Sequence, residues 1–183
     1  MLLGGNLGVT SNKSEGTSIK SNSILVSPSA GIAIARNTIV GIGLAYSHGR
    51  SDYLDPNTGT KYNLYGGSVF VRRYLALGKG FYLFGEGDLY SQGSKITTTT
   101  PSMENGQKNW VLGINIYPGI SYAINKWFQL EAALPQLANL SYMKTTNFSN
   151  GASTQIINSL GFNAAASSLS NISVGFRFLI AKG

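Results

Sequence analysis

Apolar residues recur at every second position over long stretches of this chain. The clearest stretch is 109–123, where Leu112, Ile114, Ile116 and Ile120 alternate with glycine, asparagine and other small or polar residues. A period of two is that of a β-strand, whose side chains point alternately to two faces. One face of this segment is continuously apolar and the other is mostly small and polar. The segment is therefore predicted to be a strand that separates two different environments.

The same alternation occurs in four other segments, at 23–34, 40–47, 68–77 and 172–178. A soluble barrel directs its apolar face inward and presents residues such as Lys, Glu and Thr to water. Here the second face is too small and too polar for such an exterior, whereas lipid outside and a packed polar lumen inside suit both faces. The pattern predicts a transmembrane β-barrel.

Turn chemistry predicts the topology. Three connections are short and contain asparagine or glycine, which tolerate the positive φ of tight hairpins: 36–38, 78–80 and 125–126. Four connections are long and polar, at about 11–21, 52–61, 92–108 and 144–166. Their alternation predicts one all-β domain over 1–183, an eight-stranded antiparallel up-and-down barrel. Outer-membrane barrels have short periplasmic turns and long extracellular loops, so both termini are expected in the periplasm.

The predicted turns also predict a register. Hairpins centred on Asn37, Lys79 and Asn125 bring together the apolar pairs Ile34–Val40, Leu77–Phe81 and Tyr122–Phe128. All three pairs belong to the apolar face. A slip of one residue would turn that face into the lumen, so the register is self-consistent.

Aromatic residues on the apolar face fall near its two ends. Those near the long connections are Tyr46, Tyr65, Trp110 and Tyr142. Those near the short connections are Phe81, Tyr122, Phe128 and Phe178. Two aromatic girdles that flank an aliphatic band are typical of the two headgroup boundaries of a membrane.

Composition removes several classes of protein. Charged residues are 11% of the 183 residues and apolar residues 43%, yet no stretch approaches the roughly 18 consecutive apolar residues of a transmembrane helix. A helical membrane protein is therefore excluded. The absence of cysteine removes disulfides and thiolate metal sites, and suits a compartment in which free thiols would oxidise. With a single histidine and few aspartates, we expect no metal and no cofactor.

The formal net charge is +7, from 14 Lys and Arg against 7 Asp and Glu. These positive charges are scattered, and no basic stripe interleaved with stacking aromatics is present, so nucleic acid is not an expected partner. A basic surface beside anionic lipid phosphates is the simpler explanation.

The first residues, 1–5, lack the basic start and the cleavage site of an export signal. A protein of the outer membrane must first cross the inner membrane, so we expect that a signal peptide has been removed. We therefore expect that the first strand is shortened at its N-terminal end.

Four short motifs carry a resemblance to a known family: Ser27-Pro28-Ser29-Ala30-Gly31, Phe70-Val71-Arg72-Arg73-Tyr74, Tyr117-Pro118-Gly119-Ile120-Ser121-Tyr122 and Val174-Gly175-Phe176-Arg177-Phe178. Over nearly its whole length the chain resembles the outer-membrane protein β-barrel domain family of small OmpA/OmpX-like barrels. The resemblance implies a barrel in the outer membrane of a Gram-negative envelope. It also implies that barrel-assembly machinery recognises the last strand, with Phe178 in the place of the usual terminal Phe.

Charged residues on the small, polar face are expected inside the barrel. A hairpin centred on Lys79 places Arg72 opposite Glu86, and an unpaired charge in a narrow lumen is unfavourable, so we expect an ion pair. Three further charged residues on this face are predicted to extend the pair into a network: Asp88, Glu131 and Arg177. Eight strands enclose a space that side chains just fill, so we interpret the network as a structural plug rather than a gate or proton path.

His48 is the only histidine, so an acid–base or nucleophilic mechanism would depend on it first. Small barrels include lipid A-modifying enzymes that use His with Ser and a carboxylate, and Ser47, Ser51 and Asp52 lie close in sequence. However, His48 shares the outward face of its strand, and its spacing to Ser51 departs from the His-x-Ser of the deacylase family. We therefore predict a rim histidine that faces headgroups, and no catalytic residue.

The favoured function is a non-enzymatic integral barrel with a structural or surface-interaction role. Its expected partners are outer-membrane lipid and lipopolysaccharide, with an extracellular ligand or an envelope protein at the loops. Three alternatives stay open: a lipid A-modifying enzyme using His48, a small porin-like pore, and a soluble lipocalin-like carrier with an apolar lumen and a charged exterior.

Overall fold

The structure is a computed structural model that describes residues 1–14, 19–52, 58–133, 137–164 and 173–179. Its strands are β1 (Leu2–Ser14), β2 (Ile19–Ala35), β3 (Thr38–Asp52), β4 (Gly59–Gly78), β5 (Phe81–Thr100), β6 (Met103–Ala123), β7 (Phe128–Ala133), β8 (Ala138–Ser149), β9 (Ala152–Ala164) and β10 (Ser173–Leu179). All of the pairings between them are antiparallel. Within the described ranges, no helix is long and apolar enough to cross a membrane.

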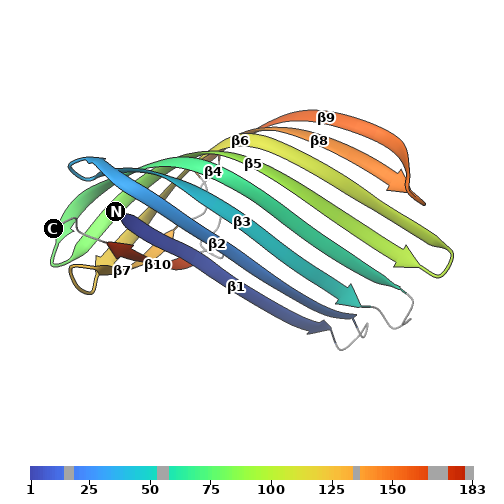
Figure 1. Ribbon diagram of the computed structural model, residues 1–183, viewed down its shortest axis with the longest axis horizontal. Coiled ribbons are helices and arrows are strands. Elements are labelled where there is room, and N and C mark those ends of the chain that lie inside the picture. The colour runs from blue at the N-terminus through green and yellow to red at the C-terminus, as the bar shows by residue number, and fades with distance from the viewer. Residues whose placement is uncertain (15–18, 53–57, 134–136, 165–172, 180–183) are drawn as a thin grey trace.

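Eight of these strands form a closed ring (Figure 1). Strands β1 to β6 pair in chain order, β7 pairs with β6 and β10, and β10 pairs with β1. The ring closes where Leu2 faces Leu179, at the same end as the β2–β3 and β4–β5 turns. The predicted all-β, antiparallel architecture is confirmed.

The ring contains eight strands, the number predicted, but the described sheet has ten because two strands lie outside the ring. Strand β6 has 21 residues, long enough for two partners on one edge: β7 pairs with 119–123 and β8 with 105–116. Strand β9 pairs with β8, so the β8–β9 hairpin extends the sheet beyond the ring and rises away from β1 (Figure 1). Within the described residues, β1 pairs with β10 only over Leu2–Gly5 and with β2 along its whole length.

The three pairs predicted beside the short turns are wrong. The observed pairs are Ile32–Val40, Gly78–Phe81 and Tyr122–Leu130, in place of Ile34–Val40, Leu77–Phe81 and Tyr122–Phe128. At the second turn, Lys79 and Gly80 both have positive φ, as a two-residue type I′ turn requires, and a neighbouring residue of β4 is left in a bulge. At the third turn, the Asn125 side-chain oxygen accepts hydrogen bonds from the backbone N–H groups of Trp127 (2.9 Å) and Phe128 (2.8 Å), which lengthens the turn.

Despite these displacements, the strands keep the predicted apolar face outward where the alternating pattern was read, as within 40–46 and 112–120. A shift of two residues, or a bulge confined to the turn, does not turn a strand over. Away from its turn, the β4–β5 hairpin keeps the predicted register, and Arg72 faces Glu86.

The prediction of a long loop at 92–108 is wrong, because most of these residues belong to β5 and β6. Strands β5 and β6 remain paired up to a tight turn at 101–102. Residues 97–100 are four threonines, and β-branched side chains favour extended strands over loop conformations. The connections predicted at 11–21 and 52–61 centre on residues outside the described ranges.

The connection predicted at 144–166 is also wrong as a loop. Most of it forms the β8–β9 hairpin, which turns at Asn150 and Gly151. Both residues have positive φ, 46° and 82°, so this is another two-residue hairpin turn. At 92–108 and 144–166, long paired strands joined by tight turns therefore take the place of the expected loops.

Burial is inverted relative to a soluble protein. Aliphatic side chains of the alternating pattern lie on the outer face, where Ile114 is 48% exposed and Ile116 51%. Charged side chains lie inside, where Arg72 is 2% exposed and Glu86 5%. The outward direction predicted for the apolar face is therefore observed.

Apolar packing inside the ring is limited to a few residues. One buried cluster consists of Leu2, Ile39 and Phe70. Elsewhere, the Phe84 ring lies directly over Gly119, so that a Cβ on this glycine would overlap the ring and lie 2.8 Å from the carbonyl oxygen of Ala132. The packing inside the ring therefore requires glycine at position 119.

We predict that Gly119→Ala lowers the free energy of unfolding by about 1–3 kcal/mol, because Phe84 must leave its packed position. Gly85→Ala is the matched control, since a Cβ at Gly85 would meet nothing within 4 Å. Urea unfolding of both variants measures the difference, and equal stability of the two would contradict the close packing at Gly119.

Candidate functional site

The candidate site begins with the pair formed by Arg72 on β4 and Glu86 on β5. The two residues face each other in the β4–β5 register and both point into the ring. Arg72 Nε donates a hydrogen bond to Glu86 Oε2, and the two charged groups form an ion pair. The pair lies away from water, because both side chains are buried.

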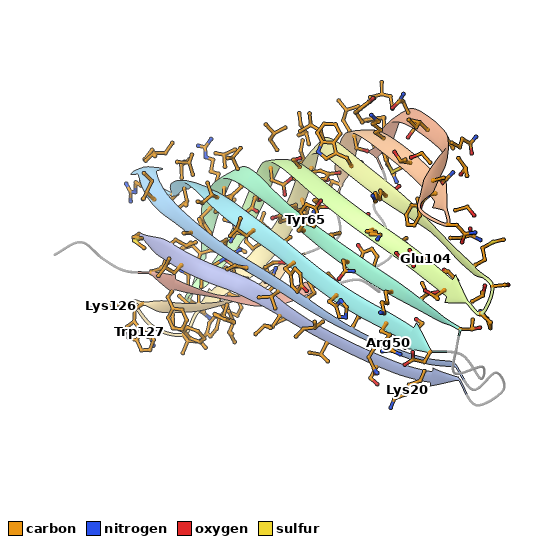
Figure 2. The ribbon with its side chains drawn as sticks, turned by 45° about the vertical axis from the view of Figure 1, so that its right-hand side comes forward. Lys20, Arg50, Tyr65, Glu104, Lys126 and Trp127 are labelled. Atoms are coloured by element: carbon orange, nitrogen blue, oxygen red, sulfur yellow. The ribbon has the colours of Figure 1, made fainter. Side chains whose placement is uncertain are left out.

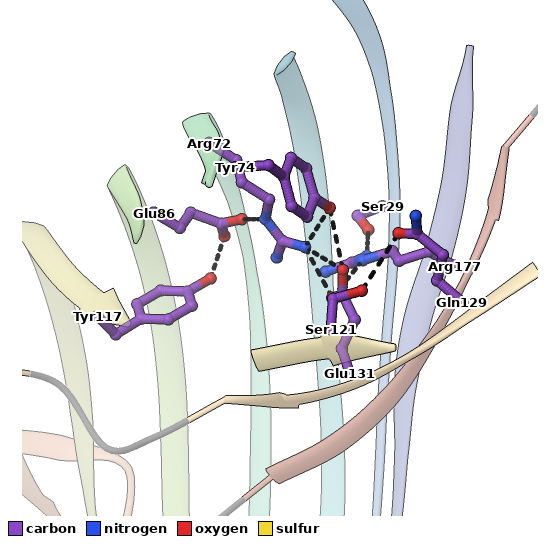
Figure 3. A network of polar contacts seen from close by, with 9 residues as sticks. All are labelled: Ser29, Arg72, Tyr74, Glu86, Tyr117, Ser121, Gln129, Glu131 and Arg177. Carbon is purple, nitrogen blue, oxygen red and sulfur yellow. Dashed lines mark hydrogen bonds and ion pairs between the residues drawn. The ribbon is translucent and has the colours of Figure 1, made fainter. Parts of the chain in front are cut away.

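A second carboxylate binds the same arginine from the other side of the ring. Arg72 Nη1 donates to both oxygens of Glu131 on β7, at 2.6 and 2.7 Å. Arg177 on β10 also donates to Glu131, through Nε at 2.9 Å. Strands β4 and β7 are not neighbours in the ring, so the Arg72–Glu131 contact crosses the lumen (Figure 3).

Neutral side chains complete the network (Figure 3). The hydroxyl of Tyr117 donates to Glu86, and that of Tyr74 donates to Glu131 at 3.0 Å. Arg177 Nη1 donates to the Ser29 hydroxyl on β2. Ser121 donates to Gln129 at 3.2 Å, and the Arg72 guanidinium lies 4.2 Å from the centre of the Phe84 ring.

The charges of the network balance, with two arginines against two glutamates. Removing four charges from water is unfavourable, and the cost is offset only where each charge is paired and its remaining donors or acceptors are bonded. Here Glu131 accepts from two arginines while Arg72 donates to two glutamates. The network is therefore a single electrostatic unit that spans β2, β4, β5, β6, β7 and β10.

The structure does not bring Asp88 into this unit. None of the ion pairs among the described residues includes it, and its buried Oδ1 has no hydrogen-bond partner. Asp88 lies two residue pairs toward the loop end, on the wall of a small polar cavity of about 210 Å³ that also borders Glu86, Tyr117 and Arg177. The four ion-paired residues are thus Arg72, Glu86, Glu131 and Arg177, and the place of Asp88 in an extended network stays a prediction.

The aromatic residues predicted to form girdles lie in two groups on the outer face. At the turn end, the Phe81 and Tyr122 rings are 4.6 Å apart between centroids, and the Phe128 and Phe178 rings 5.1 Å. At the loop end, Tyr46 pairs with Tyr65, and the Trp110 and Tyr142 rings are 6.1 Å apart. Figure 2 shows Tyr65 partway along the sheet, between Trp127 at the turn end and Glu104 at the other.

Sequence reasoning missed one aromatic residue of the turn-end group and two polar residues inside the ring. Trp127 stacks on Phe178 with ring planes 8° apart, but it lies in a turn where counting alternate residues does not apply. Gln129 and Ser121 were missed because neutral polar residues on the inward face carry no distinguishing signal. They meet because they lie diagonally across the paired strands β6 and β7, where Ser121 faces Glu131 and Gln129 faces Ala123.

His48 lies on the outer face and is exposed, as predicted. Its Nδ1 is 2.7 Å from the Asn63 side-chain oxygen. The neighbouring serines bond elsewhere: Ser47 to the Ile24 carbonyl oxygen and Ser51 to the Ser21 hydroxyl. Within the described residues, no serine or carboxylate contact activates this histidine, and no cluster of three His, Asp or Glu could hold a metal.

A scan against protein-family models found no match, and a search of curated proteins found no similar sequence. Among solved structures, the chain is similar to Neisserial surface protein A. The two share 16% sequence identity over 97% of this chain and 95% of that chain, with a TM-score of 0.43. A likeness of this size supports no conclusion about function, so the evidence for function comes from the chain's own residues.

We predict that Glu131→Gln lowers the free energy of unfolding by about 3–5 kcal/mol, since it leaves two buried arginines facing one glutamate. Glu104→Gln, on an exposed strand end, is the matched control and is expected to change stability by less than about 0.5 kcal/mol. Urea unfolding compares them. A Glu131→Gln protein as stable as the control would show that the network does not hold the ring together.

Proposed function

We propose that the chain is an integral β-barrel of the bacterial outer membrane, folded as one domain over 1–183 with its aliphatic face toward lipid. The inversion of burial carries this proposal: large apolar side chains cover the outside of the ring, while arginines and glutamates are buried inside. Soluble monomers rarely expose apolar patches larger than a few hundred Å². Hydrocarbon is the solvent that favours such an exterior, and a closed ring of strands satisfies the backbone there.

The spacing of the aromatic groups supports the same proposal. Along β4, Tyr65 of the loop-end group is 13 residues from Gly78, which pairs with Phe81 of the turn-end group. Thirteen residues are about 43 Å of strand. At a tilt of about 45°, typical of transmembrane strands, this length spans about 30 Å, the thickness of the hydrocarbon core.

A soluble lipocalin-like carrier is disfavoured by the same side chains. Such a carrier requires an apolar lumen for its ligand and a charged exterior for water. In this chain the lumen holds the Arg72–Glu86–Glu131–Arg177 network and a polar cavity, and the exterior of the ring is aliphatic.

The orientation and the partners follow from the two unlike ends of the barrel. We infer that the short turns and both termini face the periplasm and that the long hairpins face outward from the cell. Outer-membrane lipid and lipopolysaccharide then surround the barrel, and assembly machinery recognises the strand that ends near Phe178. An extracellular ligand or envelope protein would bind at the hairpins.

The role supported best is structural or surface-interacting, with the lumen plugged by side chains. The network crosses the ring from β4 to β7, and a cavity of about 210 Å³ lies on its loop side. The surroundings of His48 favour no enzymatic alternative, because its hydrogen-bond partner is an amide.

We predict that the two faces of β6 meet different solvents. The chain has no cysteine, so a single introduced cysteine can be labelled uniquely. An environment-sensitive dye on Ile114→Cys should show a blue-shifted emission that is quenched by spin-labelled lipid, because this residue is on the outer face. The adjacent Asn115→Cys, on the opposite face, is the control and should be insensitive to the lipid quencher. Equal quenching at both positions, or a wild type that folds in water without detergent, would overturn the membrane proposal.

We also predict that the wild-type barrel conducts no ions in stepwise fashion across a planar bilayer, because the network fills the lumen. Recordings at several protein concentrations test this expectation. Reproducible single-channel steps would contradict the interpretation of the network as a plug and would favour a small pore.

A further inference from the structure

Three lysines from three adjacent strands gather on the outer face, one beside the loop-end aromatic group and two just beyond it. Lys95 on β5 faces Lys108 on β6, and Lys144 on β8 faces Trp110. All three line one groove of about 480 Å³, whose walls also include Tyr65 and Trp110. The groove therefore has a positive rim and an aromatic side.

This positive charge has no counterpart within the described residues. No ion pair there includes any of the three lysines, and the carboxylate of Asp52 is bound to Arg50. Glu104 lies four residues from Lys108 along β6, about 13 Å away. Like charges directly opposite on neighbouring strands are unfavourable, so an anion between Lys95 and Lys108 would relieve their repulsion.

Aromatic residues hold the groove in shape. The ammonium groups of Lys95 and Lys108 lie 5.3 and 5.6 Å from the centre of the Phe148 ring. On the other side, the Tyr65 ring covers Gly93, where a Cβ would lie within 2.9 Å of three of its atoms. Lys95 and Lys108 are thus held against an aromatic ring beside the groove.

A shallow apolar hollow lies closer to the turn end of the same outer face. It has a volume of about 920 Å³ and extends across β2, β3 and β4 to Leu89, Ile114 and Ile116 at its edge nearest the groove. On β6, Ile114 is four residues from Trp110, or about 13 Å. A molecule with an anionic head in the groove could therefore place its apolar tails in the hollow.

We propose that this groove binds the phosphate groups of a phosphorylated glycolipid in the leaflet at the loop end, with the acyl chains in the apolar hollow. Ammonium groups bind phosphate oxygens as point charges, and three of them suit a headgroup that carries two phosphates. The adjoining hollow favours a lipid over free phosphate. This inference rests on the proposed membrane location and adds a ligand and a site to it.

The test uses the full chain folded in a neutral detergent, with Trp127→Phe so that Trp110, on the groove wall, is the remaining tryptophan. Its fluorescence is followed while bis-phosphorylated lipid A, dephosphorylated lipid A or inorganic phosphate is added. Saturable binding is expected with bis-phosphorylated lipid A only. Replacing Lys95, Lys108 and Lys144 together by Gln should weaken it about a hundredfold, since each lysine near a lipid phosphate contributes roughly fivefold.

The matched control replaces three exposed cations of the short turns, as Arg36→Gln, Lys79→Asn and Lys126→Gln, and should retain the wild-type affinity. Asn is used at position 79 because it tolerates the positive φ there. Unchanged affinity after the triple lysine substitution, or equal binding of inorganic phosphate or dephosphorylated lipid A, would overturn the lipid site alone. Failure of the wild type to fold in detergent would overturn the membrane location, and the lipid site with it.

Discussion

The cost of placing a charge inside a narrow, dry ring governs the rest of this structure. Arg72 lies in the lumen, and it is tolerated because Glu86 and Glu131 bind it from two directions. Glu131 in turn is shared with Arg177 from the strand that closes the ring. The first half of the chain and its end are therefore joined by charge as well as by backbone pairing.

This arrangement gives the polar face of the strands its own packing. Soluble domains are held together by an apolar core, whereas here few apolar residues are buried inside the ring. Tyrosines and one phenylalanine pack around the ion pairs, and the glycine at 119 makes room for Phe84. The outer face is then free to be aliphatic along the ring and to carry lysines at the loop end.

The features predicted well from the sequence are those with a local physical cause. Alternation of apolar and polar residues sets the direction of each side chain, and this holds from Ile32 to Phe178 even where the partner residue was mispredicted. The pairing of Arg72 with Glu86 follows from one hairpin. The hairpin at Asn150 and Gly151 also had a local signal, because Asn-Gly favours a two-residue turn, but the surrounding polar residues suggested a loop.

The sequence alone thus determined the two faces of the ring strands and the charged residues on the inward face, since these depend on a period of two and on turn residues close in the chain. Only the tertiary structure decided that β7 and β8 share one edge of β6, that Arg72 turns to Glu131 across the lumen, and that three lysines meet on one groove. Those contacts join residues far apart in the chain. Their geometry depends on how the ring closes, and no local pattern encodes that closure.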